Sequence, residues 1–95
     1  MESRIRSIAL RAKRFKIGET GQEQYDRLMQ HPKKYDTIET ITFSKWKRDI
    51  DAAEERMIDA FINCKNCDNE RGGSAGRMTK SSKYILYVIY ALKKK

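Results

Sequence analysis

The segment that most constrains the fold is Tyr84 to Leu92 (YILYVIYAL), nine consecutive apolar or aromatic residues near the end of the chain. Tyrosine and β-branched residues dominate it, which favours a strand that is buried on both faces over a helix. In such a strand Tyr84 and Tyr90 share one face and Tyr87 takes the other. No apolar run in the chain approaches the roughly 20 residues of a membrane-spanning helix. We therefore expect a protein without a membrane span, built around this strand.

Two further segments have the spacing of amphipathic helices. Residues 2–16 predict a basic N-terminal helix, and Gly18 just beyond them suits the end of a helix. Residues 45–63 show the clearest pattern, with Ser44 as a good N-cap residue. The apolar stripe of this longer helix consists of Trp46, Ile50, Ala53, Met57 and Phe61. As the largest apolar side chain of the stripe, Trp46 is expected in the core.

Two shorter elements complete the expected fold. A short helix is predicted to begin at Thr20 and to end at Pro32, and residues 37–43 (TIETITF) read as a strand that pairs with residues 84–92. A chain of 95 residues holds one domain. We predict a small single α+β domain, with two or three helices packed on a minimal antiparallel sheet. Because a two-stranded sheet is marginal in water, a homodimer that adds strands is also predicted.

The net charge of +8 is concentrated at the two ends of the chain. Residues 1–16 hold six basic residues and one acid, and residues 64–95 hold eight basic residues and two acids, while the middle is slightly acidic. Such asymmetry indicates a surface that meets a polyanion, the alternative being charge that only confers solubility. The expected phosphate contacts are Arg4, Arg6, Arg11, Lys13, Arg14, Lys16, Arg71, Arg77, Lys80 and Lys83.

Residues 64–82 (CKNCDNERGGSAGRMTKSS) form a basic loop that is rich in glycine and has no hydrophobic period. The run at residues 72–77 differs from a nucleotide-binding P-loop, because the glycine spacing is wrong and no Lys-Ser/Thr pair follows at the required place. Exposed backbone N–H groups and nearby cations still suit a phosphate backbone. The alternative is a flexible connection.

The sequence contains no recognisable arrangement of catalytic residues. His31 stands without a serine, a cysteine or a paired carboxylate in a recognisable motif. The acids of the longer helix fall beside Arg48 and Arg56 at helical spacing, which predicts a solvated, salt-bridged face. These acids are Asp51, Glu54, Glu55 and Asp59. We therefore predict that the protein is not an enzyme and needs no cofactor.

Cys64 and Cys67 form a CxxC motif where the longer helix is expected to end. A zinc site needs four ligands, and His31 is the only other candidate, so a metal site requires two chains that each supply one motif. A redox role is disfavoured, because the helix dipole opposes a thiolate at a C-terminus. Ordinary thiols are the remaining interpretation. Two cysteines, and an N-terminus that arginines interrupt too often for a secretory signal, predict a cytoplasmic protein.

Two functions follow from these patterns. The first is non-enzymatic binding of DNA or RNA, mainly through the phosphate backbone. The alternative is a small interaction protein, comparable to phage-encoded inhibitors of host defence enzymes, whose basic face covers an acidic protein surface.

Overall fold

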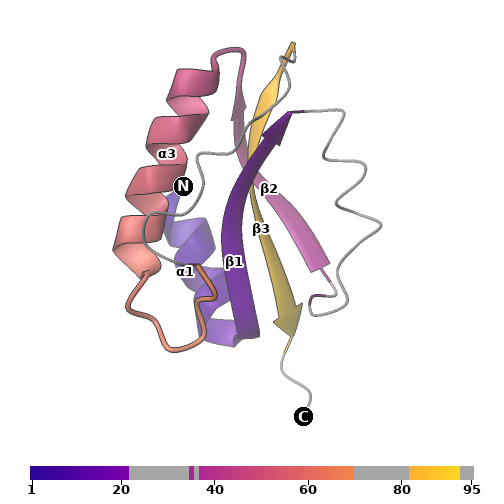
Figure 1. The fold of residues 1–95 in the computed structure, drawn as a ribbon. Coiled ribbons are helices and arrows are strands. Elements are labelled where there is room, and N and C mark those ends of the chain that lie inside the picture. The colour runs from indigo at the N-terminus through magenta and orange to yellow at the C-terminus, as the bar shows by residue number, and fades with distance from the viewer. Residues whose placement is uncertain (22–34, 36, 70–81, 93–95) are drawn as a thin grey trace.

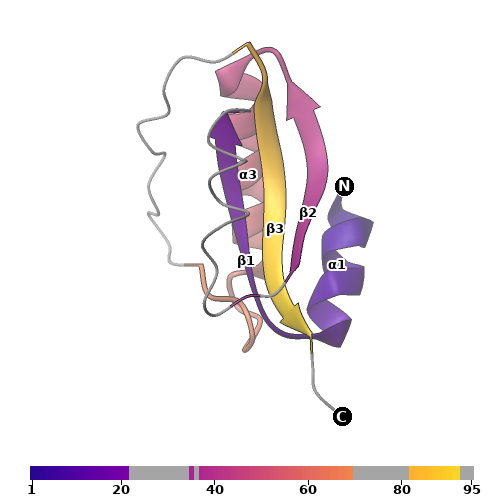
Figure 2. The same ribbon diagram turned by 90° about the vertical axis from the view of Figure 1, so that its right-hand side faces the viewer.

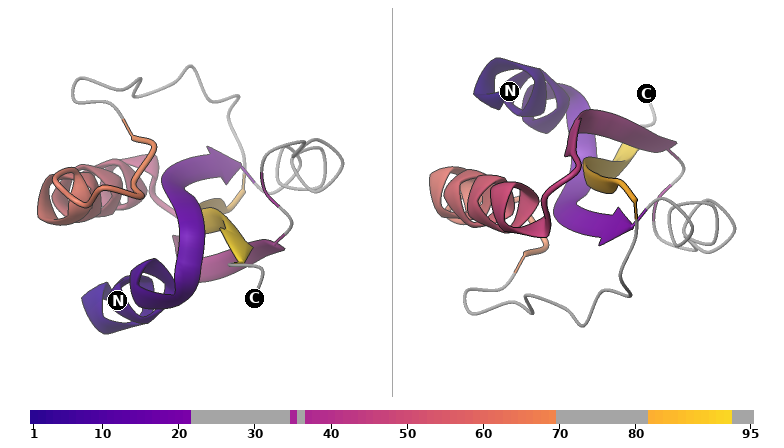
Figure 3. Two further views of the ribbon diagram at one scale, coloured as in Figure 1. Left: turned by 90° about the horizontal axis from the view of Figure 1, so that it is seen from below. Right: turned by 90° about the horizontal axis from the view of Figure 1, so that it is seen from above.

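The computed structural model describes residues 1–21, 35, 37–69 and 82–92, and their elements form a layer of helices on a sheet (Figure 1). In chain order these elements are α1 (Glu2–Arg11), β1 (Ala12–Gly21), β2 (Thr37–Ser44), α3 (Lys47–Phe61) and β3 (Tyr84–Leu92). Both helices cover the same face of the sheet, as the views along the strands show (Figure 3). The protein is a small α+β domain, as the sequence predicts.

The apolar segment at residues 84–92 is the central strand of the sheet. The strand order is β1-β3-β2, and β3 pairs antiparallel with both neighbours (Figure 2). Tyr84 and Tyr90 point into the helix-facing core, and Tyr87 lies on the other face. The predicted strand, its pairing with β2 and its alternation are confirmed. In the described residues the sheet has three strands, and the homodimer stays a prediction.

The N-terminal helix ends five residues earlier than predicted. Residues 12–16 belong to β1, and Ala12 already has extended dihedral angles (φ −86°, ψ 145°). In β1 the side chains of Phe15 and Ile17 point into the core and are 0% and 1% exposed. The apolar spacing of residues 2–16 suits a helix equally well. The strand forms because β3, which is buried on both faces, needs a hydrogen-bonding neighbour on each side.

Gly18 lies in the middle of β1 and does not end a helix. It pairs with Tyr87, whose ring crosses above it, so a methyl group on Gly18 would lie 2.4 Å from Cζ of that ring. Only a residue without a side chain permits this close approach. Thr20, the predicted helix cap, is also part of β1. The rest of the helix predicted between Thr20 and Pro32, with His31, lies outside the described residues.

Helix α3 confirms the predicted long helix, but it runs from Lys47 to Phe61, and its N-cap residue is Trp46 and not Ser44 as predicted. Ile50, Met57 and Phe61 are buried as expected, but Trp46 is 61% exposed. Trp46 is the extended residue that precedes the first turn, and its backbone N–H donates to the Ser44 hydroxyl (3.0 Å). Because Trp46 stands one residue before the helix begins, its side chain is not carried inward with the apolar stripe. The prediction that Trp46 lies in the core is wrong.

The CxxC segment after α3 lies along the outer edge of β1. The backbone N–H of Phe15 donates to the Asn66 carbonyl (2.9 Å), and the N–H of Asp68 donates back to the Phe15 carbonyl (2.9 Å). The Asn69 side chain accepts from the N–H of Ile17 and donates to its carbonyl, both at 2.8 Å. The predicted loop at residues 64–82 therefore begins as an ordered segment, and residues 70–81 lie outside the description.

Asn66 also provides hydrogen-bond donors for backbone carbonyl groups at the C-terminal end of α1. Its side-chain amide donates to the carbonyls of Ala9 (2.8 Å) and Ala12 (3.0 Å), which the helix leaves without intrahelical donors. The segment thus holds the turn from helix to strand in place. Neither of the two described helices is long and apolar enough to cross a membrane.

Candidate nucleic-acid interface

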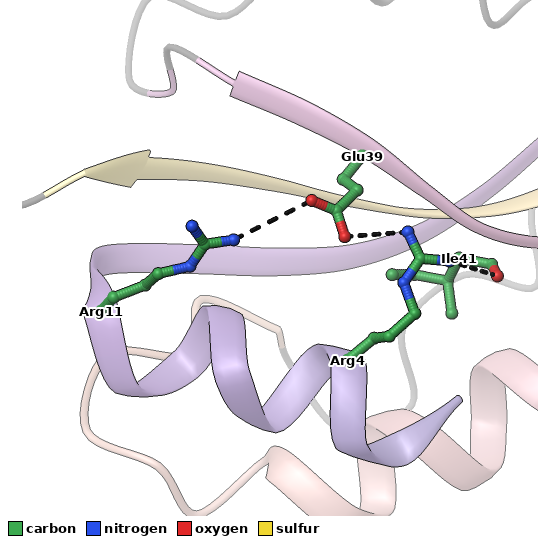
Figure 4. A network of polar contacts seen from close by, with 4 residues as sticks. All are labelled: Arg4, Arg11, Glu39 and Ile41. Atoms are coloured by element: carbon green, nitrogen blue, oxygen red, sulfur yellow. Dashed lines mark hydrogen bonds and ion pairs between the residues drawn. The ribbon is translucent and has the colours of Figure 1, made fainter.

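Two of the predicted phosphate contacts in α1 are paired with a single carboxylate. Arg4 Nη2 lies 3.0 Å from Glu39 Oε2, and its Nη1 donates to the Ile41 carbonyl (3.2 Å) (Figure 4). About two helical turns after Arg4, Arg11 Nη2 lies 4.0 Å from Glu39 Oε1. Glu39 thus connects both arginines to β2. These cations hold α1 against the sheet, and their charge is partly neutralised.

The remaining N-terminal cations are divided between α1 and β1. Arg6 pairs with Glu2 (2.5 Å), and Arg14 lies 3.9 Å from Asp68. Lys13 and Lys16 are exposed on β1, and within the described part of the chain neither has an ion-pair partner. Because the helix ends at Arg11, the six cations of residues 2–16 do not form one continuous helical face. Arg71, Arg77 and Lys80 fall outside the described residues.

Two separate cation–aromatic pairs, together with Lys45, occur where β2 leads into α3. We call this region the junction surface, and its members are Phe43, Lys45, Trp46, Arg48 and Lys83. Phe43 and Trp46 are each 61% exposed, which is unusual for large aromatic side chains. The Lys83 ammonium lies 4.2 Å from the centre of the Phe43 ring, and the Arg48 guanidinium carbon lies 5.9 Å from that of Trp46. Both distances are within the range of cation–π attraction.

The backbone fixes the position of this surface. Ser44, the last residue of β2, pairs with Tyr84, the first residue of the antiparallel strand β3. Lys45, which comes after Ser44, and Lys83, which comes before Tyr84, therefore lie at the same end of the sheet. The Ser44 hydroxyl accepts from the N–H of Trp46 and donates to Asp49 Oδ2 (3.0 Å). The Trp46 carbonyl accepts from the N–H of Asp49 (3.1 Å). With its backbone held on both sides, Trp46 is presented outward on an ordered turn.

Sequence reasoning missed this surface although a signal was present. The run Lys45-Trp46-Lys47-Arg48 surrounds one aromatic residue with three cations, which is an unfavourable composition for a buried helix start. The helical spacing of Trp46 relative to Ile50 pointed inward instead. Of the predicted contacts, only Lys83 belongs to the junction surface.

A second cluster, of carboxyl groups, lies between β1 and α3. Both carboxyl oxygens of Glu19 are buried, and among the described residues neither accepts a hydrogen bond from an N–H or O–H donor. Burial raises the pKa of Glu19 to about 8, and contact with the Asp51 carboxyl and the charge of Glu54 add to the increase. Burial also raises the pKa of Glu54 to about 7, followed by the charge of Asp51. Glu19 therefore carries a proton at neutral pH and donates it to Asp51.

Asp51 remains charged in this cluster. Its contact with protonated Glu19, and then with Lys47, lowers its pKa, and Lys47 Nζ lies 2.9 and 3.1 Å from its two oxygens. Asp51 forms a salt bridge, with Lys47, and its side chain is 34% exposed, whereas Glu54 is half-buried and departs from the predicted solvated face. Glu55 and Asp59 are exposed as predicted. The two Glu19 carboxyl oxygens themselves are inaccessible to solvent.

The two cysteines are free thiols that pack against the core. The backbone of Cys67 forms an isolated parallel β-bridge with that of Phe15. Burial raises the pKa of the Cys67 thiol. No group of three or more histidine, cysteine, aspartate or glutamate side chains suited to a metal occurs in residues 1–21, 35, 37–69 and 82–92. A zinc site shared between two chains stays a prediction.

Comparison with known proteins finds no relative. No family model, no curated protein and no solved structure matches this chain.

Proposed function

We propose that this protein is a small, basic, non-enzymatic nucleic-acid-binding protein of the cytoplasm. The observation that carries the proposal is the junction surface, where two exposed aromatic rings lie among three cations at one end of the sheet. Nucleic-acid-binding proteins combine these two features, because cations attract the phosphates while aromatic rings contact the bases. A net charge of +8 supplies long-range attraction to a polyanion.

The ion pairs divide the cations into two groups. Arg4 and Arg11 share the Glu39 carboxylate, so we expect them to contribute less to phosphate binding than the exposed Lys13 and Lys16. The strongest contributions are expected from Lys45 and Arg48 of the junction surface, which are both exposed. Arg71, Arg77 and Lys80 remain proposed contacts on the strength of the sequence alone.

Salt dependence of binding tests the proposal. If about five phosphates are neutralised, the logarithm of the association constant falls with the logarithm of salt concentration with a slope of about −4.5 on duplex DNA and about −3.5 on a single strand. Fluorescence anisotropy with labelled oligonucleotides between about 50 and 200 mM salt measures this slope. A slope near zero, or no binding at the lower salt concentration, would contradict the proposal.

A matched pair of variants locates the contacts. Lys45→Ala/Arg48→Ala removes two cations from the junction surface, and we expect the slope to become shallower by about 1.4 to 1.8. Arg56→Ala/Lys65→Ala removes the same charge at two other exposed positions and should change the slope little. Equal changes in both double variants would show that only net charge matters.

A protein partner is the second candidate function. Tryptophan and arginine are enriched at the energetic centres of protein interfaces, and Trp46 and Arg48 are exposed together. A small inhibitor that binds an acidic surface of a defence enzyme would use the same residues. Affinity capture with and without nuclease separates the two functions. Loss of every partner after nuclease treatment supports nucleic acid, whereas a stoichiometric protein that persists and requires Trp46 supports the protein partner.

A further inference from the structure

We infer that the nucleic acid bound at the junction surface is single-stranded, with unpaired bases stacked on Trp46 and Phe43. This inference rests on the proposed function and names the class of ligand. It starts from two rings that stand three residues apart in sequence and are both 61% exposed. The Cα atoms of the two residues are at most about 11 Å apart, so one strand of a few nucleotides can pass both residues.

The accessibility of the rings selects unpaired bases. Lys83 lies over the Phe43 ring and Arg48 lies over the Trp46 ring, and because both aromatic residues are still 61% exposed, each has surface open to solvent. In a duplex, each base is stacked between its neighbours and cannot present a face to a protein ring. An unpaired base can, and such stacking needs no particular base sequence. Exposed rings of this kind therefore favour single strands over duplexes.

The charges around the rings favour a nucleic acid over an apolar protein segment. Lys45, Lys83 and Arg48 flank the two rings, and Asp49 is the only acid in residues 43–49. The Asp49 carboxylate accepts a hydrogen bond from Ser44, which reduces its effective charge. Energetic centres of protein interfaces are surrounded by contacts that exclude water, whereas here the neighbours are cations suited to phosphates.

Two other exposed apolar side chains of the described residues belong to other parts of the fold. Leu10 is 77% exposed on α1, and Leu92 lies at the far end of β3 from Tyr84. The two rings are thus a separate aromatic feature set among charges. Leu10 also offers a matched control, because it is an apolar side chain at least as exposed as Trp46.

Trp46 is the only tryptophan in the chain, so its fluorescence reports on stacking directly. The full chain is titrated with a ten-nucleotide oligothymidylate and with a blunt-ended ten-base-pair duplex, at about 50 mM salt. We expect the single strand to quench the Trp46 fluorescence and to bind at least about tenfold more tightly than the duplex.

Variants then assign the stacking energy. Anisotropy of a labelled oligothymidylate should show that Trp46→Ala weakens binding about 5- to 150-fold, with a smaller loss for Phe43→Ala. Leu10→Ala should leave the affinity unchanged. Circular dichroism verifies that each variant is folded, which we expect because all three side chains are mostly exposed.

The outcomes separate this inference from the proposed function. Equal affinities for single strand and duplex, or a Trp46→Ala variant that binds oligothymidylate as tightly as the parent, would overturn the stacking inference. If the steep salt dependence persists in that case, nucleic-acid binding itself stands. Absence of binding to either oligonucleotide would overturn both, and a protein partner that is lost with Trp46→Ala would replace them.

Discussion

Replacing Glu19 by glutamine should make the protein more stable at alkaline pH. In the folded protein the pKa of Glu19 is raised from 4.5 to about 8, first by burial and then by the neighbouring carboxyl groups of Asp51 and Glu54. The folded state therefore keeps a proton that the unfolded chain releases above about pH 4.5. This stabilisation is fully present below that pH and is lost as the pH rises through about 8. Glu54 acts in the same direction, with its pKa raised to about 7.

The size of the effect follows from the two pKa values. A carboxyl pKa that moves from 4.5 to about 8 corresponds to at most about 5 kcal/mol of unfolding free energy. Although its carboxyl oxygens are buried, Glu19 as a whole residue is only half-buried, and solvent screening reduces this to about 2–3 kcal/mol. The pKa of Asp51 is lowered, so its contribution is lost only as the pH falls below its ordinary value of 3.8. Asp51 therefore does not oppose the trend between pH 5 and 9.

A glutamine at position 19 keeps a donor for the Asp51 carboxylate at every pH and cannot ionise. We expect Glu19→Gln to match the parent near pH 5 and to exceed its unfolding free energy by about 2–3 kcal/mol near pH 9. Urea unfolding followed by circular dichroism between these values measures the difference. Glu55→Gln, which removes the same charge from the exposed face of α3, is the control.

Two results would refute this reasoning. One is a parent protein whose stability is constant from pH 5 to 9. The other is an equal alkaline gain in Glu55→Gln, which would attribute the effect to net charge and not to the buried carboxyl group.

Two further predictions concern the packing of β1. Gly18→Ala should lower the unfolding free energy by about 1–3 kcal/mol, because the added methyl group collides with the buried ring of Tyr87, and thermal unfolding measures the loss. An unchanged melting temperature would show that the ring moves aside without cost. Asn66→Ala should cost about 1–3 kcal/mol, because it leaves the Ala9 and Ala12 carbonyls without their side-chain donor. In urea unfolding, a midpoint equal to that of the parent would mean that water replaces the amide.

The elements with strong local patterns could be predicted from the sequence. The run at residues 84–92 is apolar at every position and rich in tyrosine and β-branched residues, which favours a strand covered on both faces, and β3 is that strand. Residues 47–61 repeat apolar side chains at the period of a helix, and the face bearing Ile50 and Phe61 is buried. In both segments the local period and the burial required by the fold agree.

Whether Trp46 belongs to the core or to the candidate site depends on the residue at which α3 begins. The period that placed Trp46 in the core assumes that the helix already includes it, but the Ser44 hydrogen bonds start α3 one residue later. That shift brings an aromatic ring to the surface among cations. The composition of residues 45–48 indicated this outcome, and the helical period alone did not.

The features that only the tertiary structure decided are contacts between segments that are distant in sequence. Residues 12–16 suit a helix or a strand, and the strand forms because β3 needs a second neighbour while Asn66, more than fifty residues away, satisfies the end of α1. Glu19 and Asp51 share a proton although nothing in either segment indicates the other. A sequence determines periodicity and local propensity by itself. Hydrogen-bond partners and the proton affinity of a buried carboxyl group depend on which distant atoms are brought within a few ångströms, and folding alone decides that.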